Sequence, residues 1–340
     1  MLRGFWLDVA GLMFNMFEKE NKVSILIAAY NAEKTIEQCV RSAMAQTHKN
    51  IEIIVVDDVS TDSTLKIAQD LQKFDARIVV HQREHNGGPG AARNSALELS
   101  TGYWVTVLDS DDWYFPNRIE FLFGLANKNK SDLVFDNLLC IKDNKIDSKK
   151  NSEPFISSES SVLGELTLEM YVKSFSRSKT LPNLGYLKPF IKRSILASNN
   201  IRYNTRLNVG EDSLLVMELF AAGAKNVIFA DELLYCYRRH DSSISKNMSA
   251  HDLEMQVREY GSFLRSRQHV LSREVADRLR RQIEYYVESS RKRRSWNSLL
   301  DNGLRVFILE TIEKKEMRKY FFRSLFKYLK LISKSKNKAV

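Results

Sequence analysis

The chain has 340 residues, 44% of them hydrophobic and 28% charged, and this composition is typical of a globular protein. The sequence includes no apolar run of the ~18–20 residues that a membrane-spanning helix needs. Its net charge of +10 is unevenly placed, because residues 313–340 carry ten Lys/Arg against two Glu and account for +8. The remaining +2 argues against a nucleic-acid-binding protein, which would carry a basic groove on its folded body.

Residues 1–20 form an N-terminal extension whose first 17 residues are apolar but interrupted by Arg3 and Asp8. They lack the basic start, long apolar core and small-residue cleavage site of a signal peptide. We interpret this extension as either an ordered cap on the fold or an interfacial membrane anchor.

Strands and helices alternate over residues 23–109. Short β-branched runs predict buried strands at 23–28, 51–58, 76–82 and 103–109, and apolar residues at helical spacing predict helices between them. Ser60 or Thr61 is expected to cap the second helix, and a glycine-rich turn enters the third. The alternation predicts right-handed βαβ units, and hence an α/β fold with a mostly parallel sheet flanked by helices.

The pattern is looser after residue 113. A helix opened by Pro116 and a strand at 131–141 are expected, followed by a polar loop at 142–160. Ordered structure is predicted again at 183–232, and residues from about 250 onward are mostly helical.

Acidic residues gather where two predicted strands end. Asp57 and Asp58 end one strand, and the sequence Asp-Ser-Asp-Asp at 109–112 ends another. Ligands of open α/β sheets bind at this edge, and clustered carboxylates favour Mg²⁺, Mn²⁺ or Ca²⁺ over zinc. A magnesium–nucleotide site would explain both the charge and its position, and a solvated acidic turn that caps the next helix is the simpler alternative.

Two common nucleotide-binding classes lack their motifs here. The chain has no G-x-x-x-x-G-K-[ST] sequence, which argues against a P-loop nucleotidase. No G-x-G-x-x-G follows the first strand, and the glycine cluster at 87–90 comes after the third strand with different spacing. A dinucleotide-dependent oxidoreductase is therefore disfavoured.

Four motifs, in order, resemble the family 2 glycosyltransferases of the GT-A fold. They are VSILIAAYNAEKTIEQCVRSAMAQTHKNIEIIVVDDVSTDST, NGGPGAARNSAL, LDSDDW and VGEDSLL. LPNLGYLKPFIKRSIL and YRRHDSSIS are most similar to bacterial exopolysaccharide enzymes such as the succinoglycan-type glucosyltransferases. The resemblance implies a GT-A domain at 21–240, with a nucleotide-sugar half at 21–113 and an acceptor half at 114–240. A helical region at 241–340 with a basic tail would follow.

The resemblance also implies roles for residues at the nucleotide edge. Tyr30 would pack against the base and Asp58 would hydrogen-bond it, the base usually being uracil. Ala28 stands just before Tyr30 at the strand end, where many relatives have proline. Arg93, in the Ala-Arg-Asn turn, would face the diphosphate.

The same resemblance assigns the acids at 109–112 to a Mg²⁺ or Mn²⁺ site. Asp111 would contact the ribose and join Asp112 as a metal ligand, with Asp109 supporting the site. His240 is a further candidate ligand, although a lone histidine is more often structural. The arginines at 238–239 are candidate phosphate contacts or ordinary surface residues. The cation would neutralise charge that develops on the departing nucleoside diphosphate.

A sugar hydroxyl is a weak nucleophile, so direct displacement needs a general base. Glu211 and Asp212 open a predicted helix after Gly210, and acids in a first helical turn also suit the helix dipole, so spacing alone allows either role. In the family the Asp of this pair is the usual base. We therefore predict Asp212 as the base, with Glu211 as its acceptor-orienting neighbour or substitute, and inversion of the anomeric configuration.

The basic tail predicts where the protein works. Residues 319–334 place apolar and basic side chains on opposite sides of a helix, as in helices that lie on anionic membranes, and docking of the apolar side on the body is the alternative. The three cysteines are far apart and indicate a reducing compartment. The predicted location is cytoplasmic, on the inner face of the cell membrane.

These features predict an enzyme that moves a single hexose, glucose by analogy, from a UDP-sugar to a lipid-pyrophosphate-linked saccharide in exopolysaccharide synthesis, with no nucleic acid partner. One alternative is a sugar-phosphate nucleotidyltransferase, although AAYNAEK does not fit the glycine-rich loop of that class. A non-enzymatic membrane-associated scaffold is the other alternative.

Overall fold

The computed structural model describes residues 20–142, 152–157, 164–175, 182–239, 247–313 and 320, with the backbone alone for 295–313. The chain divides into two compact units, residues 1–243 and 244–340, and each is described by itself. Among its described residues the second unit contains α9 (Ala250–Arg267) and α10 (Arg273–Glu313). None of the helices in the described ranges is both long enough and apolar enough to cross a membrane. The predictions for His240, for residues 1–19 and for most of 314–340 lie outside the described residues.

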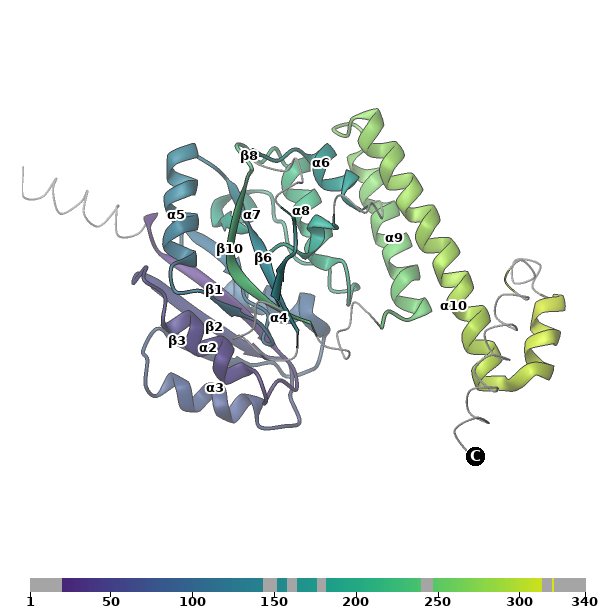
Figure 1. Ribbon diagram of the computed structural model, residues 1–340, viewed down its shortest axis with the longest axis horizontal. Coiled ribbons are helices and arrows are strands. Elements are labelled where there is room, and N and C mark those ends of the chain that lie inside the picture. The colour runs from purple at the N-terminus through teal and green to yellow at the C-terminus, as the bar shows by residue number, and fades with distance from the viewer. Residues whose placement is uncertain are drawn as a thin grey trace, which may run out of the picture. The chain divides into compact units, whose positions relative to one another are not determined.

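The first unit begins with the predicted alternation of strands and helices (Figure 1). The elements are β1 (Val23–Ala29), α2 (Ile36–Met44), β2 (Ile51–Asp57), α3 (Thr64–Gln72), β3 (Ile78–Gln82), α4 (Gly88–Leu99) and β4 (Trp104–Val107). They are followed by β5 (Trp113–Tyr114), α5 (Arg118–Asn129), β6 (Leu133–Lys142), β7 (Ser152–Pro154), β8 (Gly164–Glu165), α6 (Leu168–Lys173), the 3₁₀ helix η1 (Leu184–Tyr186), β9 (Phe190–Lys192), α7 (Arg193–Ser198), α8 (Glu211–Ala221) and β10 (Ile228–Arg239).

One sheet runs through the unit in the order β3-β2-β1-β4-β9-β6-β10-β5, with β7 paired to β6 and β8 to β10. Strands β1 to β4 are parallel, and β6 is parallel to β10. Between these two parallel sets lies β9, which is antiparallel to both β4 and β6. The mostly parallel α/β sheet that the sequence predicts is confirmed.

The parallel strands form the core and bring their carboxyl ends to one edge. β2 is buried at every position and β1 at all but Ala28, which is half-buried. Helices α2 and α3 pack on each other and on β2, whereas α4 packs on β1 and β2. Right-handed crossovers in this strand order place α4 on the opposite face of the sheet from α2 and α3.

The start of α3 differs from the prediction. The helix begins at Thr64 and follows Ser63, and neither Ser60 nor Thr61 caps it. Instead, Ser60 Oγ accepts a hydrogen bond from the backbone N–H of Asn31, and the N–H of Thr61 donates to Asn31 Oδ1. These two residues therefore tie the turn after β2 to the turn after β1, where the predicted nucleotide edge lies.

Val59, directly after Asp58, has a φ of +65°, in the left-handed region that β-branched residues rarely adopt. Such strain costs about 1–3 kcal/mol, and glycine relieves it because it has no Cβ. We expect Val59→Gly to raise the free energy of unfolding by about 1 kcal/mol, measured by chemical denaturation. Val79→Gly is the matched control on β3 and should lower stability. A Val59→Gly protein less stable than wild type would contradict this interpretation.

Candidate active site

The carboxyl ends of β1, β2 and β4 meet at one edge of the sheet. Tyr30 follows β1 and is 53% exposed, whereas Asp57 at the end of β2 is fully buried. The turns continue the strand pairing, because the N–H of Asp58 donates to the carbonyl of Ala29 at 2.8 Å. An exposed aromatic ring beside buried acids is suited to stacking and hydrogen bonding of a nucleobase.

Asp58 organises the turn between β3 and α4. It is 2% exposed, forms an ion pair with Arg83, and accepts hydrogen bonds from the backbone N–H groups of residues 87–88. A carboxylate offers about four acceptor sites, and the contacts with Arg83 and residues 87–88 occupy them, because the N–H of Gly87 reaches both oxygens. Oδ1 of Asp57 is buried with no hydrogen-bond partner among the described residues, and a donor on a bound ligand would offset that cost. The roles of Asp58 and Ala28 at a nucleobase stay predictions.

Asp112 anchors the turn after β4 from inside the protein. It is 1% exposed, its Oδ2 accepts from the Tyr235 hydroxyl at 2.7 Å, and its Oδ1 accepts from the N–H of Arg238 at 2.8 Å. Burial, together with the neighbouring Asp111 and Asp109, raises the pKa of Asp112 well above its usual range. Both oxygens of Asp112 are hydrogen-bonded within the protein, and its role as a metal ligand stays a prediction.

Arg238 also stabilises this turn. Its Nε donates to the carbonyl of Asp111 at 2.7 Å, its Nη2 donates to a glutamine of α2 at 2.6 Å, and its guanidinium lies 4.8 Å from the Trp113 ring centre. At 7% exposure it is not a surface arginine, and its predicted phosphate contact stays a prediction. Arg239 forms an ion pair with Glu153.

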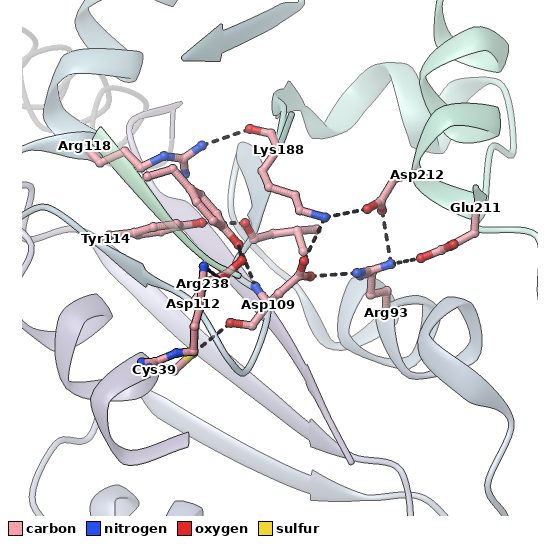
Figure 2. Close-up of polar contacts among 12 residues, drawn as sticks. Cys39, Arg93, Asp109, Asp112, Tyr114, Arg118, Lys188, Glu211, Asp212 and Arg238 are labelled. Atoms are coloured by element: carbon pink, nitrogen blue, oxygen red, sulfur yellow. Dashed lines mark hydrogen bonds and ion pairs between the residues drawn. The ribbon is translucent and has the colours of Figure 1, made fainter. Parts of the chain in front are cut away.

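Two cations connect the strand edge to the start of α8 (Figure 2). Arg93 of α4 lies 2.7 Å from Asp109 Oδ1 through Nη2, and its Nη1 lies 2.5 Å from Glu211 Oε1 and 3.1 Å from Asp212 Oδ1. Nζ of Lys188 lies 2.8 Å from Asp109 Oδ2 and 2.6 Å from Asp212 Oδ2. Each aspartate therefore contacts both cations. We call Arg93, Asp109, Lys188 and Asp212 the charge ring.

The two cations of the ring are nearly closed to solvent, at 5% exposure each, whereas the side chains of Asp109 and Asp212 are 23% and 14% exposed. Burial favours the neutral form of Asp109, but Lys188 and Arg93 outweigh it and hold the pKa of Asp109 well below its usual range. Burial and the adjacent Asp212 raise the pKa of Glu211 to about 7, against the opposing effect of Arg93. Glu211 therefore titrates near neutral pH, whereas Asp109 stays ionised.

The backbone at the start of α8 places both acids. Gly210 has a φ of +89°, a conformation that favours glycine, and Glu211 and Asp212 follow as the first two residues of the helix. Seven of the helix's residues, including Glu211, are buried. The helix is therefore held against the protein with its acidic end at the ring.

The structure brings Asp109, Arg93, Glu211 and Asp212 together, as an active site requires. The structure places the Arg93 guanidinium against three carboxylates, and its predicted contact with the diphosphate stays a prediction. Sequence reasoning missed Lys188 altogether. A single lysine before a short strand carries no local signal, and only the fold shows what it contacts.

A mostly parallel α/β sheet with acids at its edge and a carboxylate-bearing helix beside them is the arrangement of GT-A glycosyltransferases. Residues 24–194 match Glycosyl transferase family 2. The chain belongs to this family and is a glycosyltransferase, as its motifs predict.

Three individual proteins illustrate the relationship. The chain is 30% identical over 248 residues to the succinoglycan biosynthesis protein ExoO of Rhizobium meliloti (strain 1021), which covers 73% of this chain and 69% of that protein. It is 38% identical over 135 residues to the UDP-Glc:alpha-D-GlcNAc-diphosphoundecaprenol beta-1,3-glucosyltransferase WfaP of Escherichia coli, covering 40% of this chain and 53% of WfaP. The crystal structure of S. aureus TarS 1-349 in complex with UDP matches with a TM-score of 0.54 at 25% identity, covering 72% of this chain and 65% of TarS. The predicted GT-A fold is confirmed.

Proposed function

We propose that this glycosyltransferase moves one hexose from a UDP-sugar to a saccharide hydroxyl with inversion at the anomeric carbon. The charge ring is the observation that carries the proposal, because it holds Asp212 next to the strand-edge residue Asp109. A base placed opposite the departing diphosphate performs a single displacement, which inverts the configuration. The UDP complex of TarS and the UDP-Glc in the name of WfaP support UDP as the nucleotide.

We also infer a divalent metal, Mg²⁺ or Mn²⁺, bound through Asp111. Within the described ranges no three His, Cys, Asp or Glu side chains are grouped as a ligand set. This fits an ion that takes one or two carboxylates from the protein and completes its shell with substrate phosphates. Asp111 is half-buried at the strand edge, unlike the enclosed Asp112, and so is the better ligand. When bound, the ion would neutralise charge on the leaving diphosphate.

The protein's own groups would divide the remaining work. Tyr30 stacks on the uracil, and the acids at 57–58 accept from its N–H. Asp212 takes the proton of the acceptor hydroxyl as that oxygen attacks the anomeric carbon. Arg93 and Lys188 hold the Asp212 carboxylate in place through their ion pairs.

We infer a lipid-pyrophosphate-linked saccharide as the acceptor and the inner face of the cell membrane as the place of reaction. WfaP is named for a diphosphoundecaprenol-linked acceptor and ExoO for succinoglycan biosynthesis, which supports this assignment and glucose as the hexose. The membrane contact is assigned to the basic residues within 319–334.

The test is a donor panel of UDP-hexoses with a synthetic prenyl-pyrophosphate saccharide, in Mn²⁺, in Mg²⁺ and in chelator. We expect one donor to release UDP only with metal and to give a β-linked product by NMR. An α-linked product or full activity in chelator would contradict the proposal. UTP with a hexose 1-phosphate, read as pyrophosphate release, tests the nucleotidyltransferase alternative. No UDP binding by calorimetry under any condition would favour the scaffold alternative.

A further inference from the structure

We propose that Lys188 is the positioning residue of the general base and holds Asp212 at a fixed position relative to the donor site. The inference rests on the proposed function, in which Asp212 takes the acceptor proton. Lys188 itself would touch neither the donor nor the acceptor, and would act by fixing where the base lies.

The contacts of Lys188 join two distant parts of the chain. Its Nζ lies between Asp109, which follows β4, and Asp212, which opens α8 (Figure 2). Two carboxylates this close repel each other unless a cation separates them. Because both cations are 5% exposed, Lys188 provides that charge together with Arg93, and a solvent ion does not.

The backbone of Lys188 is held by the core of the sheet. Its carbonyl oxygen accepts a hydrogen bond from Nη2 of Arg118 at 2.9 Å. Arg118 is completely buried, forms an ion pair with the equally buried Asp136 at 2.7 Å, and lies 4.3 Å from the Tyr114 ring centre. The ammonium therefore extends from a fixed point, and the position of Asp212 is set relative to the sheet (Figure 2).

Arg93 cannot replace this contact. Its Nη1 is 3.1 Å from Asp212 and already lies 2.5 Å from Glu211, whereas Lys188 reaches Asp212 at 2.6 Å. Without Lys188, Asp212 would keep only the longer of its two ion pairs. What Lys188 contributes to catalysis is therefore the placement of Asp212.

The experiment compares wild type, Lys188→Met, Lys188→Arg and the control Lys192→Met, using the full chain and the donor found above. For Lys188→Met we expect kcat to fall about 100-fold, as for a base displaced by about 1 Å, while the donor KM and the Kd of UDP change less than about threefold. Lys188→Arg keeps the cation and should recover at least about tenfold of that loss. Lys192, on β9, faces Tyr103 and is not part of the ring, so Lys192→Met should match wild type.

The outcomes separate this inference from the proposed function. Wild-type kcat in Lys188→Met overturns the inference, and so does a UDP affinity that falls in parallel with kcat, which would make Lys188 a diphosphate contact. If thermal melting shows that Lys188→Met does not fold, the test uses Lys188→Arg alone. A folded Lys188→Arg protein with near-wild-type KM and partial kcat supports the inference. A folded Lys188→Arg protein without any transfer activity overturns it. A wild type and a Lys192→Met protein that use no UDP-sugar would refute the proposed function itself.

Discussion

Asp212→Asn is expected to lower kcat for sugar transfer by about 10²–10⁴-fold, because an amide cannot accept the acceptor's proton. UDP binding should stay close to that of wild type, since the contacts proposed for the uracil and the metal lie on the strand edge. The substitution also leaves Lys188 and Arg93 without one of their shared carboxylates, so a loss of stability is expected as well. Steady-state kinetics, UDP calorimetry and thermal melting measure these three effects separately.

The matched control is Glu211→Gln, which changes the adjacent acid of the same helix turn. Its amide oxygen can still accept from Arg93, so we expect a loss of kcat of no more than about tenfold. If Glu211→Gln proved more damaging than Asp212→Asn, Glu211 would be the base. The raised pKa of Glu211, about 7, makes it the one credible competitor.

Asp111→Asn is expected to remove the dependence of UDP binding on metal. In chelator the variant should bind UDP as wild type does, whereas Mn²⁺ should no longer increase the affinity. We expect kcat/KM for the donor to fall about 10²–10³-fold, the equivalent of several kcal/mol of lost charge stabilisation. Calorimetry with and without Mn²⁺ gives the binding result directly.

Asp112→Asn is the control that shows whether Asp112 is a metal ligand or a buried residue that stabilises the turn. Here the expected loss is one of stability, about 1–3 kcal/mol, because an amide cannot accept both the Tyr235 hydroxyl and the N–H of Arg238. Metal-dependent UDP binding should persist in the folded fraction. A stable Asp112→Asn protein that has lost this metal dependence would return the ligand role to Asp112.

The sequence predicts the site residues that are placed by the local pattern of strands. It does not predict those that are placed by contacts between distant segments of the chain. Asp57, Asp58 and Asp109 follow buried strands, and parallel strands necessarily bring such residues to one edge. The choice between Asp111 and Asp112 is different, since adjacent acids of one turn look alike in sequence. Only the hydrogen bonds from β10 show that Asp112 faces inward.

The charge ring shows the same limit over longer distances. Its members come from residues 93 to 212, and no spacing rule relates a lysine at 188 to an aspartate at 109. The strand that brings Lys188 to the ring, β9, has three residues and runs against its neighbours, so hydrophobic periodicity does not reveal it. Ser60 and Thr61 failed as caps because tertiary hydrogen bonds to Asn31 outweighed a local preference.

The antiparallel strand β9 has a mechanical consequence. It pairs with β4 through Trp104, Val105 and Thr106 on one side and with β6 through Leu133 and Val134 on the other, so the two parallel sets of strands share one hydrogen-bonded sheet. Two sets of strands joined this way cannot swing apart about a hinge without breaking backbone hydrogen bonds. Any movement that accompanies binding is therefore expected in the segments that leave the ladder.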